Sequence, residues 1–320
     1  MKYLILGGNG VFGVHCARHF LRGHEVICVG RNVEKPEPFT LNVNLHKNYT
    51  YHQIHVVYEY DRLMDLFDAE RPDYIINFAA QGEGAVSWKD SWRFFDTNST
   101  ALARMVEHPM PYLKRWVQIG TSELYGSVEK PSREDDPIIP SSPYAASKAA
   151  ADMHLISINK VLGFPMNIVR PSNAYAPGQL LHRVIPKAVV FGLTGRKMPL
   201  HGGGRAEKSY IHAADLAKAI DIVSQGPEGV YNVGPENPVS IRSLMEIVAQ
   251  NLCLPFEDLV EETPGRLGED SRYWLDSSKI RELGWKQEIG LEQGLLGMVD
   301  WGRKYIEQLC NWPSGYVLRA

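Results

Sequence analysis

Two groups of side chains suited to acid–base chemistry lie near the middle of the chain. Tyr144 and Lys148 are four residues apart, so in a helix they share one face. A lysine ammonium beside a phenol favours the phenolate, which lets the tyrosine accept a proton near neutral pH. Thr121, Ser122 and Glu123 add hydroxyls and a carboxylate. The two groups together supply two bases, whereas the oxidation of an alcohol needs only one.

The N-terminus indicates which molecule these bases act beside. The apolar run Tyr3–Leu6 predicts a strand, a glycine-rich turn follows at once, and an amphipathic run then extends to Leu21. This order favours binding of a dinucleotide, because glycines let the backbone approach a diphosphate and helix N-termini attract anions. The spacing Gly-x-x-Gly-x-x-Gly is informative through its position between strand and helix. The predicted cofactor contacts in the turn are Gly7, Asn9, Gly10, Val11, Phe12 and Gly13.

Apolar runs alternate with helical patterns through the first half of the chain. Strands are predicted at Tyr3–Leu6, Glu25–Val29, Ile54–Val57, Tyr74–Asn77, Trp116–Ile119 and Met166–Val169, and helices at Asp61–Phe67, Trp92–Val106 and Pro143–Val161. This rhythm predicts an α/β fold with a doubly wound parallel (Rossmann) sheet. It loosens after Pro171. We expect a dinucleotide-binding domain over residues 1–171 and a smaller substrate-binding lobe over residues 172–320, with some segments of the lobe returning to the first domain.

Composition narrows the function classes. The 320 residues are 44% hydrophobic and 22% charged, as in ordinary globular proteins, and the net charge of −3 gives no sign of a nucleic-acid partner. Four scattered cysteines and eleven histidines lack metal-ligand spacing, so we expect no metal site. We see no signal peptide and no membrane-spanning run, and we expect a cytoplasmic protein.

Short motifs recur in a fixed order along nearly the whole chain. They are Gly7-x-x-Gly10-x-x-Gly13, Asn77-Phe78-Ala79-Ala80-Gln81, Thr97-Asn98, Thr121-Ser122-Glu123-Leu124-Tyr125-Gly126, Tyr144-x-x-x-Lys148, Arg170-Pro171-Ser172-Asn173-Ala174-Tyr175-Ala176-Pro177 and Tyr210-Ile211-His212-Ala213-Ala214-Asp215-Leu216. In these motifs the chain resembles the extended short-chain dehydrogenase/reductase superfamily. It is most similar to the nucleotide-sugar 4,6-dehydratases. The segment around Glu123 resembles GDP-mannose 4,6-dehydratase, and the C-terminal half resembles dTDP-glucose 4,6-dehydratase.

The resemblance implies a lyase that converts a nucleotide-diphosphate hexose into its 4-keto-6-deoxy product. The implied steps are oxidation at C4, elimination of water across C5 and C6, and reduction at C6. Tyr144 and Lys148 serve the C4 hydroxyl with help from Thr121, and Glu123 removes the C5 proton. Ser122 lies where the dTDP-glucose enzymes carry an aspartate, so either Glu123 performs both proton transfers or a water assists.

The resemblance also implies the cofactor contacts. Gly30 lies where an acidic residue would bind the ribose 2′-hydroxyl of NAD, and Arg31 is suited to a 2′-phosphate. We therefore expect NADP, with NAD as the alternative. Further expected cofactor contacts are Ala79, Ala80, Asn98, Tyr144 and Lys148, although Asn98 fits a buried structural amide equally well.

Expected substrate contacts gather in the second half. They are Gln81, Asn173, His182, Arg183, Val184, Arg205, Lys208 and Arg272. Lys208 replaces the arginine of most relatives, and lysine lacks the bidentate fork, so diphosphate binding is expected to shift to Arg205. The helices over residues 92–106 and 143–161 predict a homodimer or higher homo-oligomer.

Two other activities remain open on the same fold, UDP-sugar 4-epimerase and UDP-glucuronate decarboxylase. A non-catalytic nucleotide-sugar sensor is a third reading, which the intact set of Thr121, Glu123, Tyr144 and Lys148 disfavours. The sequence leaves open the nucleotide base, the hexose, and whether an epimerisation accompanies dehydration.

Overall fold

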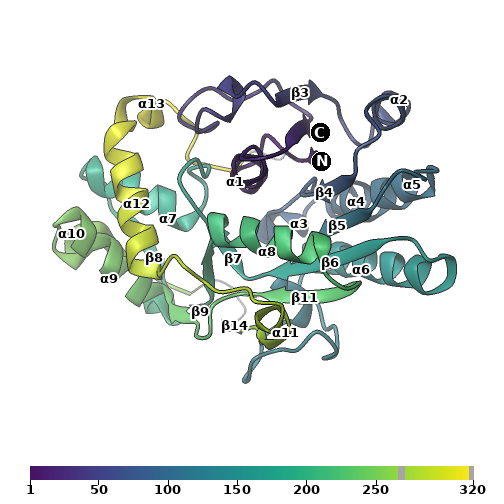
Figure 1. Cartoon of the computed structure of the whole chain (residues 1–320). Coiled ribbons are helices and arrows are strands. Elements are labelled where there is room, and N and C mark those ends of the chain that lie inside the picture. The colour runs from purple at the N-terminus through teal and green to yellow at the C-terminus, as the bar shows by residue number, and fades with distance from the viewer. Residues whose placement is uncertain (266–270, 317–320) are drawn as a thin grey trace.

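A parallel sheet of seven strands forms the centre of the computed structural model, which describes residues 1–265 and 271–316 (Figure 1). The strand order is β11-β6-β5-β4-β1-β2-β3, and each neighbouring pair is parallel. The strands are β1 Lys2–Leu6, β2 Glu25–Gly30, β3 Tyr49–Gln53, β4 Tyr74–Asn77, β5 Arg115–Ile119, β6 Met166–Pro171 and β11 Gly229–Val233. The predicted Rossmann-type fold is confirmed.

Helices cover both faces of the sheet, which explains why its central strands are continuous apolar runs rather than alternating ones. One face carries α1 (Val11–Phe20) and α8 (Ala213–Gln225), which contact each other. The other face carries α2 (Tyr60–Glu70), α5 (Ala101–Glu107) and α6 (Pro143–Leu162). A separate apolar core lies on each face of the sheet. The sheet is therefore a rigid support for the loops that follow its strands, which carry the predicted site residues.

Helix α6 carries both Tyr144 and Lys148, and its ends are well defined. Ser142 caps its N-terminus by accepting a hydrogen bond from the Ala145 amide at 3.1 Å, and Pro143 occupies the first turn. Gly163 ends it in the left-handed conformation, with φ of 68°. The predicted helix over residues 143–161 is therefore confirmed to within one residue.

Two predicted elements differ from the structure. The strand expected at Ile54–Val57 is wrong, because β3 lies just before it at Tyr49–Gln53. β3 is an edge strand with a largely polar sequence, whereas Ile54 and Val56 leave the sheet and bury their side chains in the core beside α2. The single helix expected at Trp92–Val106 runs without a break from residue 91 to residue 107, but it contains a π-helical turn that the sequence did not predict. Its parts are α4 (Ser91–Phe95), the π-helical turn η2 (Asp96–Thr100) and α5.

The second half builds a smaller layer at the left of Figure 1, with its own apolar core. Its elements are β7 Asn173–Tyr175, α7 Val184–Leu193, β8 Met198–His201, η4 Gly202–Gly204, β9 Glu207–Lys208, β10 Tyr210–His212, β12 Val239–Ser240, α9 Ile241–Leu252, α10 Phe256–Leu259, β13 Val260–Thr263, β14 Arg272–Tyr273, α12 Leu291–Lys304 and α13 Ile306–Cys310. The short helix α11 Ser278–Glu282 instead contacts β11 of the main sheet. The short elements η1 Val43–Leu45, α3 Gly84–Ser87 and η3 Ser122–Tyr125 lie in loops of the first half.

The chain passes between the two layers more than once. β11 and α8 come from beyond residue 171, yet they belong to the main sheet and its helical cover. The boundary at residue 171 stays a prediction. Among the helices that the structure describes, none is long and apolar enough to cross a membrane.

Candidate active site

The glycine turn after β1 is shaped for close approach to the backbone. Gly7 has φ of 76°, and a β-carbon there would lie 2.8 Å from the Ala79 amide nitrogen. A β-carbon on Gly13 would lie 2.6 Å from the Gly7 carbonyl oxygen. Gly10 is the N-cap of α1, and Val11 and Phe12 form its first turn. These residues fit a dinucleotide diphosphate, because amide groups at a helix N-terminus attract phosphate. The glycines carry no side chain that would keep the phosphate away from the backbone.

The loop after β2 is held against this turn by Asn9. The Asn9 side chain donates to the Val33 carbonyl at 2.9 Å and accepts from the Lys35 amide at 3.1 Å. The Lys35 ammonium in turn donates to the Asn9 carbonyl. Arg31 begins the same loop and is half-buried. Two cations thus lie beside the turn, at the place where a parallel sheet of this type receives the adenosine ribose.

The loop after β4 is fixed from beneath by Asn98. Its side-chain oxygen accepts from the Gln81 amide at 2.8 Å, and its nitrogen donates to the Gln81 carbonyl at 3.1 Å and to Ser147 Oγ at 2.9 Å. Asn98 is buried in η2 and is not among the residues that line the cleft described next, so the structure favours the structural amide. Ala79 lies at the turn of this loop against Gly7, and Ala80 lines the cleft.

A cleft of about 670 Å³ opens beyond the carboxyl ends of β4, β5 and β6, and both candidate bases line it. Thr121 follows β5 and caps η3 by accepting from the Glu123 amide at 3.2 Å. A β-carbon on Gly84 would lie 3.4 Å from Glu123 Oε2 and 4.0 Å from Tyr144 Cδ1, so the carboxylate and the phenol border one small residue. Thr121, Glu123, Tyr144 and Lys148 all line the cleft. Ser122 is buried and is not among the lining residues.

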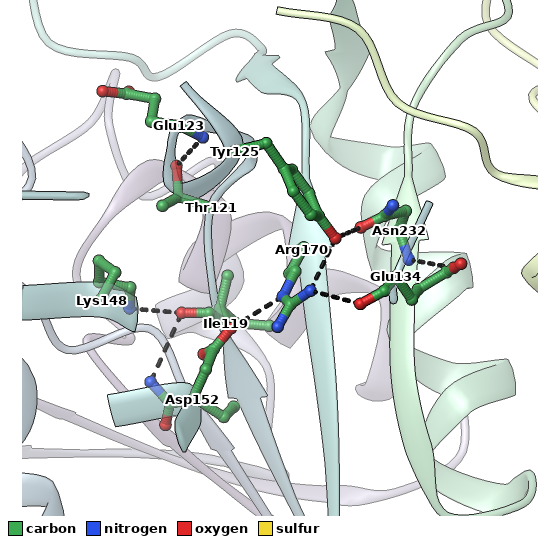
Figure 2. A network of polar contacts seen from close by, with 10 residues as sticks. Ile119, Thr121, Glu123, Tyr125, Glu134, Lys148, Asp152, Arg170 and Asn232 are labelled. Atoms are coloured by element: carbon green, nitrogen blue, oxygen red, sulfur yellow. Dashed lines mark hydrogen bonds and ion pairs between the residues drawn. The ribbon is translucent and has the colours of Figure 1, made fainter. Parts of the chain in front are cut away.

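The electrostatics of the pair on α6 differ from the expectation. Burial, followed by the Glu123 charge, raises the pKa of Tyr144 above its usual range, while Thr121 opposes the shift through a hydrogen bond. Burial lowers the pKa of Lys148 to about 8, and Asp152 opposes that shift. The Lys148 ammonium donates to the Ile119 carbonyl (Figure 2). These shifts oppose the predicted phenolate, which stays a prediction.

The start of α7 brings three of the predicted substrate contacts to the cleft, beside the loop after β4. His182, Arg183 and Val184 line the cleft at the start of α7, as does Asn173 of β7. Arg183 donates to the Gly82 carbonyl at 2.6 Å and its Nη1 lies 3.3 Å from Glu83 Oε2, so it ties α7 to the loop after β4. Burial, then the charge of Arg183, lowers the pKa of His182 to about 4, which leaves the ring neutral.

The other predicted contacts separate into two sets. Lys208 is buried, lines the cleft and places its ammonium 3.7 Å from the centre of the Tyr273 ring. Arg205 is exposed and Arg272 is ion-paired with Glu207, and neither is among the lining residues. The expected shift of diphosphate binding to Arg205 requires this residue to line the cleft. The structure does not place it there. Gln81 is buried beneath the cleft and accepts from the Tyr316 hydroxyl at 3.3 Å.

Sequence reasoning missed several residues that line the cleft. Lys187 lies one helical turn after Arg183 on α7, and this i, i+4 spacing was a usable signal. Glu83 and Tyr273 reach the cleft from a loop and from a two-residue strand, for which the sequence gave no signal. Within residues 1–265 and 271–316 no group of three or more His, Cys, Asp or Glu side chains is arranged to hold a metal ion.

Comparison with known proteins agrees with this geometry. The family model described as GDP-mannose 4,6 dehydratase matches residues 4–298. A crystal structure of dTDP-glucose 4,6-dehydratase from Bacillus anthracis in complex with NAD superposes with a TM-score of 0.87 at 28% identity, covering 97% of this chain and 99% of that one. A UDP-glucose 4-epimerase from Thermus thermophilus in complex with NAD gives 0.87 at 26% identity, covering 95% and 99%.

A trifunctional UDP-glucose 4,6-dehydratase, 3,5-epimerase and reductase of Arabidopsis thaliana is 31% identical over 248 residues, which are 74% of this chain. The chain spans only 37% to 46% of the length of this enzyme and its two plant paralogues. The fold and the cleft define a dinucleotide-binding enzyme of the extended short-chain dehydrogenase/reductase type. Within that type, the chain belongs to the GDP-mannose 4,6 dehydratase family of nucleotide-sugar enzymes.

Proposed function

We propose that the protein is a nucleotide-diphosphate hexose 4,6-dehydratase that produces a 4-keto-6-deoxyhexose still attached to its nucleotide. The observation that carries the proposal is the placement of Glu123 and Tyr144 beside the same residue, Gly84, in one cleft. Two bases at one sugar serve a reaction that removes two different protons, first from an oxygen and then from a carbon. Reversible oxidation at C4 alone needs only the base that removes the proton from the oxygen.

The cofactor site that supports this chemistry comprises the turn Gly7–Gly13, Arg31, Ala79, Ala80 and Lys148. When bound, the nicotinamide dinucleotide accepts hydride from C4 and later returns it to C6. Burial holds the pKa of the Tyr144 phenol high, and a bound oxidised nicotinamide would favour its ionisation through its positive charge. Lys148, anchored on the Ile119 carbonyl, adds a second cation.

The side chains then have separate roles. Tyr144 takes the proton of the 4-hydroxyl while Thr121 hydrogen-bonds O4. The ketone that results acidifies the C5 proton, which Glu123 removes. Glu123 next delivers a proton to the 6-hydroxyl, which leaves as water. Ser122 is not among the lining residues, so we assign both transfers to Glu123.

The test follows the sugar's own atoms. With deuterium at C4 of the hexose, a dehydratase transfers the label to C6 and releases no net reduced cofactor, as seen by mass spectrometry and NMR. Glu123→Gln is expected to reduce the cofactor transiently and to lose water at least about 100-fold more slowly. The matched variant Glu83→Gln, which also alters a carboxylate of the cleft, should keep the label transfer. Deuterium that stays at C4 would show that the reaction is not dehydration.

The same assay separates the rival activities. The Thermus thermophilus neighbour shows that an epimerase shares the fold. An epimerase would return only sugar inverted at C4, and a decarboxylase acting on a glucuronate would release carbon dioxide. Glu123 is the residue that favours dehydration over epimerisation, because an epimerase needs no base for the C5 proton.

For the cofactor we propose NADP in preference to NAD. The support is the pair of cations, Arg31 and Lys35, in the loop held by Asn9, since a 2′-phosphate carries charge that a hydroxyl lacks. NAD is the molecule bound in the two neighbouring structures described above, so it is the alternative. The nucleotide base can be identified by thermal-shift measurements with GDP, UDP, dTDP and CDP, because a ligand that binds only the folded state raises its stability.

We also propose a homodimer formed by α4 and α6. Met153 and Ile156 of α6 are 54% and 37% exposed, and Trp92 of α4 is 59% exposed, which leaves an apolar face on adjacent helices. Two such faces form a four-helix bundle across a two-fold axis. Light scattering should give twice the chain mass, and Met153→Glu should shift it towards the monomer. The conclusion fails if the wild type is monomeric at micromolar concentration.

A further inference from the structure

A buried polar network lies directly behind the two bases, and the proposed reaction does not use any of its side chains (Figure 2). Its centre is Arg170 on β6, which is 1% exposed. Arg170 Nε donates to Asp152 Oδ2 at 2.9 Å, and Nη1 donates to the Tyr125 hydroxyl at 2.6 Å and to the Glu134 carbonyl at 3.0 Å. The Tyr125 hydroxyl donates onward to Asn232 Oδ1 at 3.0 Å.

The two side chains that Arg170 holds belong to the two elements that carry the bases. Tyr125 is the last residue of η3, two residues after Glu123. Asp152 lies on α6, one turn after Lys148 and two turns after Tyr144, so the three share a face of the helix. The Arg170 guanidinium therefore joins η3, which carries Glu123, to α6, which carries Tyr144.

The packing around Arg170 leaves little freedom. A β-carbon on Gly120, the residue before Thr121, would lie 3.1 Å from Arg170 Cγ and 3.2 Å from Asp152 Oδ2. The planar fork of arginine fixes the directions of its donors, so its two partners are held at a set separation. A buried ion pair of this kind contributes little net stability compared with apolar side chains of the same volume.

We propose that Arg170 is a positioning residue that sets the separation between Glu123 and the Tyr144–Lys148 pair, with Tyr125 holding the Glu123 turn and Asp152 holding α6. The kinetic part of this proposal rests on the dehydratase function proposed above. Each tether serves one base, so loss of the Tyr125 tether should slow the elimination of water and leave the oxidation at C4 nearly unchanged. Oxidation depends on Tyr144 and Thr121, and Thr121 follows directly on β5, whose end is held by the hydrogen bond from the Gly120 amide to the Val169 carbonyl at 2.7 Å.

Tyr125→Phe is the mildest way to cut the turn tether, because the ring stays beside Arg170 and the guanidinium keeps Asp152 and the Glu134 carbonyl. Tyr231→Phe is the matched control. Tyr231 is also a buried tyrosine, with a single hydrogen bond to the Pro227 carbonyl at 2.8 Å, and it adjoins Asn232 on β11, where successive side chains point to opposite faces.

The first measurement needs no substrate. Hydrogen exchange by mass spectrometry should show faster exchange in the peptide that covers residues 121–126 of Tyr125→Phe, where the Gly126 amide donates to the Glu123 carbonyl at 3.1 Å. Exchange along α6 should be unchanged, and Tyr231→Phe should leave both segments as in the wild type. Unchanged exchange in residues 121–126 would overturn the proposed tether whatever the enzyme's reaction.

The second measurement separates the two chemical steps by stopped-flow absorbance of the reduced nicotinamide, followed by quench and product analysis. Tyr125→Phe should slow elimination about tenfold, as expected for loss of a hydrogen bond to a charged group, and oxidation less than twofold. In a Glu123→Gln background Tyr125→Phe should add almost nothing, because residues that act as a unit are non-additive. Equal slowing of both steps, or an additive effect, would overturn the proposal.

Asp152→Asn tests the contact between Arg170 and α6. In contrast to Tyr125→Phe, it should slow the oxidation at C4 more than the elimination of water. The control for Asp152→Asn is Asp221→Asn. Asp221 lies on α8 and pairs with His19 of α1, so its substitution should change neither step. If the wild type fails to move deuterium from C4 to C6, the dehydratase function is wrong, and the exchange experiment alone then decides whether Arg170 holds the turn.

Discussion

The catalytic end of the cleft and its substrate end are built in opposite ways. Thr121 and Lys148 are buried and follow long strands or lie on a twenty-residue helix, with hydrogen bonds that leave each side chain one position. Lys208 instead lies on a two-residue strand and neighbours the exposed Arg205. The difference suggests a division of roles under the proposed function: the sheet and its helices would fix the reaction, and short segments would set the choice of substrate.

The sharpest test of this contrast is Lys148→Met. We expect the turnover number to fall about 1,000-fold, because acid–base assistance at C4 is lost, while nucleotide-diphosphate binding stays unchanged. The wild-type rate should also decline above about pH 8, since burial lowers the pKa of Lys148 to about 8 and its charge is lost above that value. Steady-state kinetics and calorimetric binding measure the two effects. Weakened nucleotide binding would mean that the two ends are not separate.

At the substrate end the expected effects are smaller and fall on binding. Lys208→Ala should raise KM for the nucleotide sugar about tenfold with little change in the turnover number, because a cation in the cleft loses its contact with the diphosphate. Arg205→Ala removes a neighbouring cation that is not among the lining residues, and should change KM less than twofold. If diphosphate binding has shifted to Arg205, Arg205→Ala would raise KM more than Lys208→Ala.

Arg31→Ala probes a third position, at the adenosine end of the cofactor. We expect binding of NADP to weaken about tenfold and binding of NAD to change little, because only NADP loses a charged partner. Fluorescence titration of each dinucleotide measures both constants. Equal losses for the two cofactors would show that Arg31 does not contact the 2′-phosphate.

A further effect concerns stability in acid and not activity. His15 on α1 and His212 at the start of α8 are buried edge to face, with ring centroids 5.8 Å apart, and burial lowers the pKa of each to about 4. Unfolded histidine titrates near 6.5, so the unfolded state binds more protons below that value. The free energy of unfolding should therefore fall as pH decreases from about 6.5 to 4, by on the order of 3 kcal/mol for each ring. Urea titrations at several pH values measure it, and His15→Gln should flatten the slope.

The same contrast explains what could be predicted from the sequence. The sequence predicted that Thr121, Glu123, Tyr144 and Lys148 lie together because their proposed chemistry demands fixed spacings within a helix or a turn, and all four line one cleft. It predicted the parallel sheet because buried strands are apolar runs. β3 was misplaced because an edge strand is exposed along one side and is therefore polar, while the apolar run beside it, Ile54–Val57, packs outside the sheet.

The predicted phenolate depends on a contact that the spacing alone does not settle. A spacing of four residues places Tyr144 and Lys148 on one face, but it does not say which acceptor the ammonium will choose. The structure gives it the Ile119 carbonyl of a neighbouring strand. Lys187 and Glu83 were missed because their roles arise only when α7 and the loop after β4 are folded against each other.

The position of β11 at one end of the sheet order has a consequence for synthesis. β6 is the neighbour of β11, so until residues 229–233 have left the ribosome the nascent sheet has an open edge at β6. An uncovered parallel edge is a template for pairing with other chains. A ribosome pausing between residues 171 and 229 would therefore leave an aggregation-prone intermediate, and a fragment that stops at residue 171 should aggregate rather than fold alone.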